Sequence, residues 1–429
     1  MPSTQQWIDF FHAPAAATTL TRLYGADGVS LQTERYLNLL DRFHQQFGDG
    51  EPALFSTPGR TEIGGNHTDH NHGRVLAASV NLDAIAAAMP SGDLRVTLIS
   101  EGFEPFIVDL NTLTVNPDEE GTTEALIRGI AARFNELGYS IGGFSAVMTS
   151  DVLTGSGLSS SAAVEVLIGS IFNGLFNRGK IKPQTLAGIG QYAENVYFGK
   201  PCGLMDQMAC AMGGILTIDF FRPEKAVVES VDFDFNAQDY ALCVVDTGGD
   251  HADLTGDYAA IPEEMKAVAA VLGEAVCRPL DFHQLQAHMA ELREKAGDRA
   301  VLRAMHFIDD NQRVYHQVKA LRSGDFDEFL YLVHESGLSS HRWLQNVAPI
   351  HHTENQPIGL ALALAERFIE AVGEGASRVH GGGFAGTIQV FLPREKVEEL
   401  IAFFTPAFGP NAVKSLTIRP VGTLQWRLT

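Results

Sequence analysis

Apolar residues recur at helical spacing in two early segments of the chain. The first run, at positions i, i+4, i+7 and i+11, consists of Tyr36, Leu40, Phe43 and Phe47. Because Gly48 follows this run directly, the pattern predicts an amphipathic helix that ends at the glycine. A second helix is predicted over residues 126–137, where large apolar residues share one face and Gly138 ends the segment.

Runs of β-branched and aromatic residues predict strands between and after these helices. In the first half of the chain the predicted strands cover residues 94–100, 106–110 and 144–152. In the second half, strands are predicted at 240–246 and 387–392 and helices at 262–272 and 360–372. Strands and helices therefore alternate, and the pattern predicts a mixed α and β protein.

The composition is that of a folded globular protein. Of the 429 residues, 45% are hydrophobic and 19% are charged, and the length suits two large domains or three of average size. The boundary between two domains is predicted near residues 213–214. The formal net charge is −21, and such a surface repels nucleic acid and anionic membranes. DNA-binding, RNA-binding and membrane-surface roles are therefore disfavoured.

The cysteines and the N-terminus bear on cellular location. The chain has four cysteines, Cys202, Cys210, Cys243 and Cys277, and none forms a CxxC pair. Reduced thiols fit this pattern better than disulfides do. No basic N-terminal segment precedes an apolar run, and the longest apolar stretches, such as residues 75–89, are broken by polar residues. The sequence therefore favours a cytoplasmic protein over a secreted or membrane-spanning one.

A segment rich in glycine and serine, residues 154–163, joins the predicted strand at 144–152 to a predicted helix at 162–175. Glycines let a backbone approach an anion closely, and a helix start offers unpaired N–H groups and the positive end of its dipole. Ser160 stands where the dinucleotide-binding pattern needs its last glycine, and the lysine of the Walker pattern is absent. The segment is therefore another kind of phosphate loop, or a serine-capped helix after a glycine turn.

Residues 58–73 form a glycine-punctuated segment crowded with polar groups. These groups are Arg60, Glu62, Asn66, His67, Asp69, His70 and His72. A simple connection does not need so many multidentate side chains, whereas a polyhydroxylated ligand would use them. A metal bound by the histidines and Asp69 is a second interpretation, although their spacing matches no established zinc pattern. A solvated polar loop is the third.

Two later segments also place unusual residues together. Asp206 lies between apolar neighbours, where a carboxylate is costly to bury without a partner. A catalytic acid, an N-cap and a core salt bridge would each explain it. Three consecutive glycines at 381–383 precede the predicted strand at 387–392, as expected where backbone approaches another group closely. A glycine bulge is the plainer explanation.

Together and in this order, the four segments resemble the kinase superfamily of galactokinase, homoserine kinase, mevalonate kinase and phosphomevalonate kinase. The resemblance is closest to galactokinases, and it rests on residues 58–69, 155–163, 201–207 and 381–386. It implies an α+β fold of two domains, 1–214 and 215–429, with the active site in the cleft between them. It also implies that ATP phosphorylates the C1 hydroxyl of galactose, with Mg²⁺ as the cofactor.

The resemblance implies a role for each matching residue. Asp206 is the catalytic acid–base group, and Arg60 is its neighbour near the C1 hydroxyl. The residues that line the sugar site are Asn66, His67, Asp69, Gly203 and Tyr258. The residues of the phosphate loop are Gly155, Ser156, Gly157, Leu158, Ser159, Ser160 and Ser161. The residues that hold Mg²⁺ are Ser161 and Glu194. An ionised aspartate can accept the hydroxyl proton, and a neighbouring arginine keeps it ionised.

The chain departs from the usual galactokinase pattern at several positions. Asn66 stands where a glutamate associated with the C6 hydroxyl of the sugar is usual, and Glu62 replaces an asparagine. His70 replaces a tyrosine, and Asp250 replaces a basic residue. Because these changes bear on the sugar, galacturonate and N-acetylgalactosamine are alternative substrates. A non-catalytic regulator that binds sugar and ATP, and a zinc hydrolase that uses the histidines, are alternatives from other classes.

Overall fold

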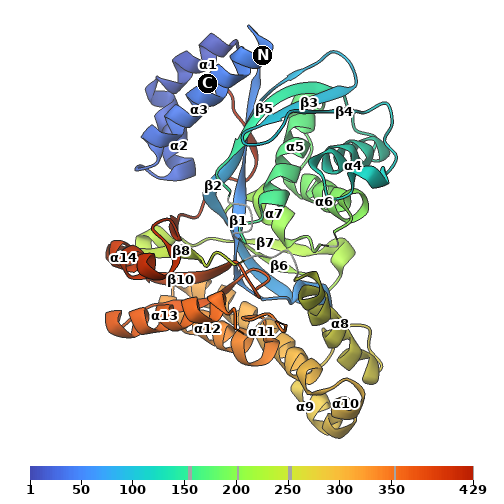
Figure 1. Cartoon of the computed structure of the whole chain (residues 1–429), viewed down its shortest axis with the longest axis vertical. Helices are drawn as coiled ribbons and strands as arrows, with labels where there is room; N and C mark the ends of the chain where they lie inside the picture. Colours follow the sequence, from blue (N-terminus) through green and yellow to red (C-terminus); the bar gives the residue numbers. More distant parts are fainter. Residues whose placement is uncertain (153–156, 201, 250–253, 352–353, 429) are drawn as a thin grey trace.

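The computed structural model describes residues 1–152, 157–200, 202–249, 254–351 and 354–428 (Figure 1). Within these residues, the larger of two sheets has eight strands. Its path runs β12-β1-β2-β5-β3-β4, and β6 and β7 extend it from the other end of β2. The strands are β1 (Ala53–Gly64), β2 (Arg74–Pro90), β3 (Arg95–Ser100), β4 (Phe106–Asp109), β5 (Phe144–Ser150), β6 (Ile215–Asp219), β7 (Val227–Val231) and β12 (Leu424–Gln425).

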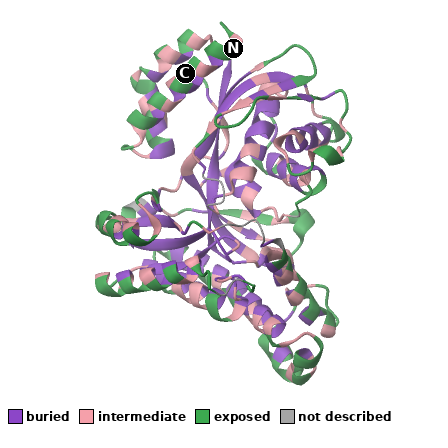
Figure 2. Ribbon diagram, viewed as in Figure 1, coloured by how far each residue is buried: buried purple, intermediate pink, exposed green. Residues whose placement is uncertain are grey.

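Two long strands connect the upper and lower parts of the molecule. In Figure 1, β1 runs from the upper helices down to the smaller sheet. All of β1 is buried (Figure 2), because other elements cover both of its faces. The segment 75–89, one of the longest apolar stretches of the sequence, lies within β2. Burial on both faces explains why this segment is a nearly continuous apolar run rather than an alternating one.

Helices cover both faces of the upper part of the larger sheet. One face packs against α1 (Thr4–Phe11), α2 (Pro14–Tyr24) and α3 (Val29–Phe47). The opposite face packs against α4 (Thr123–Glu136), α5 (Ser160–Phe176) and α6 (Pro183–Ala193). Leu54 faces the first group and Phe55 the second, because successive side chains of a strand point to opposite faces.

The smaller sheet has four strands within the described residues, in the order β11-β8-β10-β9. They are β8 (Tyr240–Asp246), β9 (Ala376–His380), β10 (Thr387–Pro393) and β11 (Val413–Leu416). One face packs against α13 (Pro357–Val372) and α14 (Val397–Phe408). The other face shares a core with α7 (Met205–Met212), α11 (Asp298–Ser323), α12 (Phe326–Ser339) and the lower part of β2. This shared core joins the two sheets.

A helical extension leaves the body beside the smaller sheet, at the lower right of Figure 1. It contains α8 (Thr255–Val271), α9 (Phe282–Ala287), α10 (Met289–Lys295) and the first part of α11. Because Ile261, Leu285 and Phe307 belong to one buried cluster, the extension has an apolar core of its own.

The structure confirms most of the predicted elements. The predicted helix that ends at Gly48 is α3, and Gly48 adopts a φ of 72° there. The predicted strand at 240–246 is β8. The predicted start of a helix at Pro262 is wrong, since α8 begins at Thr255 and carries Pro262 inside. Proline favours the first turn of a helix, but an interior proline is tolerated at the cost of one backbone hydrogen bond.

The mixed α and β architecture is confirmed, whereas the division at residue 214 stays a prediction. That position lies between α7 and β6. Both β6 and β7 then join the larger sheet, and β12 returns from the end of the chain to pair with β1.

Candidate active site

The four segments that the sequence analysis singled out meet where the two sheets join. Arg60 lies in β1, Gly157 and Ser159 precede α5, and Asp206 lies in the first turn of α7. The glycines that follow β9 bring the fourth segment to the same place: a Cβ on Gly157 would lie 2.9 Å from Nδ1 of His380.

Arg60 and Asp206 form a two-point ion pair. Nε of Arg60 donates to Oδ1 of Asp206 at 2.7 Å, and Nη2 donates to Oδ2 at 2.8 Å. Nη1 of Arg60 donates to the carbonyl of Gly157, so one guanidinium joins the carboxylate to the glycine loop. The backbone N–H of Arg60 also donates to the Leu158 carbonyl at 3.0 Å. This close approach needs Gly59, since a Cβ there would lie 2.9 Å from the same oxygen.

The surroundings of Asp206 keep its carboxylate ionised. Burial alone would raise the pKa of Asp206, but the charge of Arg60 and hydrogen bonds from Arg60 and Ser159 hold it below its ordinary value. One third of the side chain is exposed, whereas Arg60 is 7% exposed. The pair is therefore a charged, partly open site and not a sealed core salt bridge, which was one of the interpretations left open by the sequence.

The glycine and serine segment is a turn into the N-terminus of α5. Gly157 has a φ of 69° and Ser159 a φ of 57°, so both adopt left-handed backbone conformations. Leu158 is buried in the core, which anchors the turn, while Ser160 and Ser161 are half-buried in the first turn of the helix. The predicted ligands Gly155 and Ser156 lie outside the described residues. The described part fits an anion cradle at a helix start.

The two residues predicted to hold Mg²⁺ lie together. Oγ of Ser161 is 3.4 Å from Oε1 of Glu194, which lies in the π-helical turn Glu194–Phe198. A hydroxyl and a carboxylate are hard oxygen donors of the kind Mg²⁺ takes, and Mg²⁺ usually completes its coordination with phosphates and water. The donor set therefore fits this ion. Among the described residues, no three His, Cys, Asp or Glu side chains converge on a metal position.

Gln207 and Glu165 are functional candidates that the sequence analysis did not identify. Nε2 of Gln207 donates to Oε2 of Glu165 at 2.9 Å and to Oε2 of Glu194 at 2.8 Å. Burial, followed by the charge of Glu194, raises the pKa of Glu165 well above its ordinary value. The Gln207 amide thus holds Glu194 in place beside Ser161. In the sequence, the only feature that pointed to a functional role for Gln207 was its position directly after Asp206.

Three of the predicted sugar residues, Asp69, Gly203 and His67, have defined surroundings in the structure. Asp69 is 13% exposed, and its Oδ2 lies so close to Gly203 that a Cβ on Gly203 would collide with it. Nε2 of His67 lies 2.9 Å from the carbonyl of Gly382, so this nitrogen carries a proton and donates. Burial lowers the pKa of His67 to about 4, and the imidazole is neutral near pH 7.

The hydrogen-bonding groups of Asn66 are occupied by the protein. Its Nδ2 donates to Oε1 of Glu62 at 3.0 Å and to the carbonyl of Gly381 at 2.6 Å. Its Oδ1 accepts from Nδ2 of Asn346 at 2.8 Å and from the Ser340 hydroxyl at 3.3 Å. The side chain is fully buried. A sugar would have to displace these partners to reach Asn66.

Tyr258 and Arg378 hold other parts of the site together. The hydroxyl of Tyr258 donates to the carbonyl of Gly383 at 2.8 Å, and the tyrosine ring packs against Gly382. Arg378, in β9, donates from Nη2 to Oε1 of Glu62 at 2.7 Å, and both side chains are buried. Glu62 and Arg378 lie far apart in the chain and no spacing rule connects them, so their pairing could not be predicted from the sequence.

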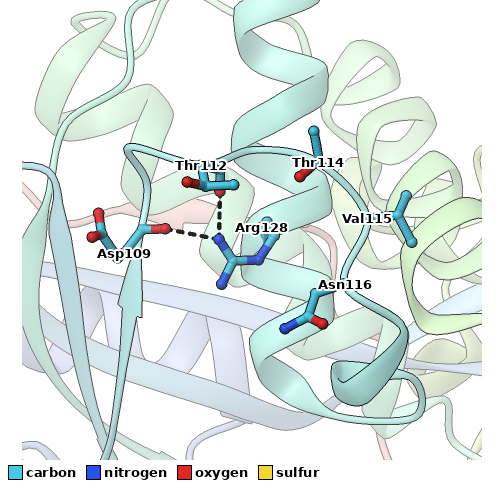
Figure 3. Close-up of a pocket in the computed structure, with 6 residues that line it drawn as sticks. All are labelled: Asp109, Thr112, Thr114, Val115, Asn116 and Arg128. Atoms are coloured by element: carbon cyan, nitrogen blue, oxygen red, sulfur yellow. Dashed lines mark hydrogen bonds between the residues drawn. The ribbon is translucent and has the colours of Figure 1, made fainter.

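A separate pocket of about 310 Å³ lies beside α4 (Figure 3). Its lining is Asp109, Thr112, Thr114, Val115, Asn116 and Arg128. Arg128 donates to the carbonyls of Asp109 and Thr112, and it pairs with Glu119 at 2.7 Å. The only basic group of this lining therefore anchors the loop before α4.

Within the described residues, no helix is both long enough and apolar enough to cross a membrane.

Two family models match parts of this chain, and curated relatives match most of it. The model of the galactokinase galactose-binding signature matches residues 41–90, and that of the GHMP kinases N terminal domain matches residues 125–214. The galactokinase of Glaesserella parasuis is 30% identical over 371 residues, which cover 84% of this chain and 90% of that protein. The galactokinase of Streptomyces coelicolor is 29% identical over 378 residues, which cover 87% of this chain and 93% of that protein.

Solved structures share the fold over most of the chain. The structure of Lactococcus lactis galactokinase complexed with galactose has a TM-score of 0.76 and 24% identity, and it covers 90% of this chain and 98% of its own. A mevalonate kinase structure has a TM-score of 0.60 and 14% identity, and the match covers 85% of this chain and 98% of that one. The two family models contain Arg60 and Asp206 respectively, and with the relatives they show that this chain belongs to the galactokinase family.

Proposed function

We propose that this protein transfers the terminal phosphoryl group of ATP to the C1 hydroxyl of galactose. One observation carries the proposal: the Arg60 guanidinium bonds both oxygens of Asp206 and also the backbone of the loop before α5. A proton acceptor and an anion cradle are thereby fixed to one group. Relatives named galactokinase match most of the chain.

Asp206 accepts the proton of the attacking hydroxyl in this proposal, and Arg60 stabilises negative charge on the attacking oxygen. An aspartate held below its ordinary pKa is a weak base. Phosphoryl transfer passes through a loose transition state with little need for early deprotonation. The positioning of the hydroxyl and the stabilisation of charge therefore contribute more than basicity does.

The N-terminus of α5 is proposed to bind the phosphates of ATP. Gly157 provides the close backbone approach, and Ser160 and Ser161 lie in the first helical turn, where N–H groups lack helical partners. Ser161 and Glu194 are proposed to hold Mg²⁺, which would offset phosphate charge when bound. The local cradle is needed because the net charge of the chain is −21.

The galactose site is proposed to lie beside Asp69, His67 and Gly203. Asp69 offers carboxylate oxygens to sugar hydroxyls, and Gly203 lets the backbone of the α7 segment approach that carboxylate. Asn66 and Tyr258 remain part of the proposed site. Their hydrogen bonds to the carbonyls of Gly381 and Gly383 hold the glycine segment after β9 in place. Galacturonate and N-acetylgalactosamine are not favoured, because the relatives named above are galactokinases.

We also propose a cytoplasmic location. All four cysteines are free thiols in the described structure, and Cys210, Cys243 and Cys277 are buried. Free buried thiols are typical of proteins kept in a reducing compartment.

A sugar-panel assay tests the proposed activity. The purified protein is incubated with ATP, Mg²⁺ and galactose, glucose, galacturonate or N-acetylgalactosamine, and ADP release is followed together with the phosphorylated product. We expect galactose to give the highest kcat/KM and galactose 1-phosphate as the product. Sugar and ATP binding without turnover would favour the regulator instead, and a clear preference for another sugar would refute the substrate assignment.

A further inference from the structure

Ser159 occupies the N-cap position of α5 but does not cap the helix. A serine N-cap normally has extended backbone angles, and its hydroxyl accepts a bond from the N–H two or three residues later. Ser159 instead has φ 57° and ψ 58°, and its side chain makes no capping bond. A left-handed conformation is strained for a residue with a side chain. Strain of this kind is concentrated at functional sites.

The hydroxyl of Ser159 donates to Oδ2 of Asp206. The same oxygen accepts from Nη2 of Arg60 at 2.8 Å, whereas Oδ1 accepts from Nε of Arg60 at 2.7 Å. A carboxylate has about two acceptor positions on each oxygen. Among the described residues, Arg60 and Ser159 therefore fill both positions of Oδ2, whereas Arg60 fills one of the two positions of Oδ1. The two oxygens of Asp206 are not equivalent.

We propose that Ser159 is a positioning residue that saturates Oδ2 of Asp206 and so assigns Oδ1 as the atom that accepts the sugar's proton. This inference rests on the proposed function. In the transfer step, the C1 oxygen forms a bond to the γ-phosphorus of ATP, and the bond from that phosphorus to the β–γ bridging oxygen breaks. The proton of the C1 hydroxyl moves to Oδ1, and ADP leaves with the electron pair of the broken bond.

This role differs from the one that the resemblance implied. There Ser159 was a ligand of the ATP phosphates, whereas here its hydroxyl bonds Asp206 and only its backbone belongs to the loop. The two roles separate in kinetics. A phosphate ligand contributes to ATP binding, while a residue that orients Asp206 acts on turnover.

The test uses Ser159→Ala and Ser159→Gly. Both remove the hydroxyl, but only glycine adopts the left-handed conformation without strain. We expect kcat at saturating ATP and galactose to fall about 10- to 100-fold in both variants, the scale of a hydrogen bond to a charged group. The dissociation constant of a fluorescent ATP analogue should stay close to that of the unchanged protein. Because Ser159→Gly relieves strain, it gives a folded variant even where Ser159→Ala is unstable.

A double-variant cycle then asks whether Ser159 acts through Asp206. In an Asp206→Asn background, Ser159→Gly should cause little further loss of kcat, because the group that it orients is already gone. The inference is overturned if Ser159→Gly keeps the full kcat, if its defect lies in nucleotide affinity alone, or if the two losses multiply. Failure of the unchanged protein to phosphorylate galactose would instead refute the proposed function, so the two failures are distinguishable.

Discussion

Arg60 and Asp206 bond through two parallel contacts, with Nε to Oδ1 at 2.7 Å and Nη2 to Oδ2 at 2.8 Å. The two residues come from different elements of the chain, Arg60 from β1 and Asp206 from α7. A fork of this kind fixes the plane of the carboxylate as well as its charge. The geometry therefore orients the carboxylate, the proposed proton acceptor, in a way that a single contact would not.

Asp206→Asn is expected to lower kcat by about 10²–10⁴-fold, the scale for a positioned acid–base group. The asparagine keeps the shape of the side chain but removes the countercharge of the buried Arg60, so the melting temperature is measured as well to show that the variant is folded. Asp93→Asn is a matched control, since Asp93 also pairs with an arginine, Arg95, but on the surface. Steady-state kinetics and thermal unfolding of both variants check this, and full activity of Asp206→Asn contradicts the assignment.

Arg60→Lys is expected to be a severe change although it keeps the charge. A lysine cannot bond both carboxylate oxygens and the Gly157 carbonyl from one planar group. The loss of a bond between charged groups predicts a fall in kcat/KM of about 10- to 100-fold. Kinetics at saturating and limiting galactose check the result. Activity equal to that of the unchanged protein would show that the two-point geometry is dispensable.

The pH dependence follows from the lowered pKa of Asp206. Because the folded protein holds this pKa below its ordinary value, the carboxylate stays ionised as the pH falls from neutral, and Asp206 should not limit kcat/KM down to about pH 5. Without the arginine, burial dominates and raises the pKa. The residual activity of Arg60→Met should therefore decline more steeply below neutral pH than that of the unchanged protein. Parallel profiles of the two proteins would contradict this.

Gly203→Ala is expected to raise the KM for galactose while nucleotide affinity stays unchanged. The added Cβ would collide with Oδ2 of Asp69 and push the carboxylate out of place. Gly188→Ala in α6 is the control, because a Cβ there meets nothing within 4 Å. Galactose titrations of both variants check the difference. An unchanged KM in Gly203→Ala would remove Asp69 from the proposed sugar site.

Removal of Mg²⁺ with a chelator is expected to abolish turnover and to weaken ATP binding. Glu194→Gln should raise the Mg²⁺ concentration that restores tight binding of a fluorescent ATP analogue, because the carboxylate near Ser161 is lost. Glu291→Gln, at an exposed position paired with Lys295, serves as the control. Equal Mg²⁺ requirements in the two variants would show that Glu194 does not hold the ion.

Asp83 is expected to dominate the stability of the packing between α3 and the larger sheet. This fully buried carboxylate pairs with Arg35 at 2.6 Å and with Arg419 at 2.8 Å. Asp83→Asn leaves the buried Arg419 without its countercharge, whereas Arg35 keeps its pair with Asp151. Breaking a buried ion pair in this way costs about 3–5 kcal/mol. Denaturant unfolding measures the change in the free energy of unfolding, with Asp93→Asn as the exposed control. A change no larger than that of the control would contradict the interpretation.

The pH dependence of stability has a defined sign at Asp83. Burial raises its pKa, but the two arginines outweigh burial and hold the folded-state pKa below its ordinary value. The stabilisation is therefore fully present above the unfolded pKa of about 3.9 and is lost as the pH falls through the folded value. Asp83→Asn should remove this part of the acid dependence.

Local patterns in the sequence were sufficient for many elements. The apolar spacing before Gly48 is confirmed in α3, and the apolar run at 240–246 is confirmed in β8. The glycine and serine segment does lead from a strand into a helix, α5. These features depend on neighbours a few residues away. The start of α8 could not be placed in this way, because the helix continues through Pro262.

Contacts between distant segments were beyond the reach of spacing rules. The resemblance indicated that Arg60 and Asp206 are partners, but it did not indicate that Glu62 pairs with Arg378 or that Asn66 is saturated by its neighbours. Ser159 shows the limit most clearly, since the direction of its hydroxyl follows from a left-handed φ that serine rarely adopts. No residue pattern in the sequence predicts that conformation.

The most direct test of the account is a crystal structure of the protein with galactose and a non-hydrolysable ATP analogue. We expect the C1 hydroxyl within hydrogen-bonding distance of Oδ1 of Asp206, with Arg60 still on both oxygens and the terminal phosphate in line with the C1 oxygen. A sugar whose C1 hydroxyl faces away from Asp206, or a nucleotide bound away from the start of α5, would contradict the account.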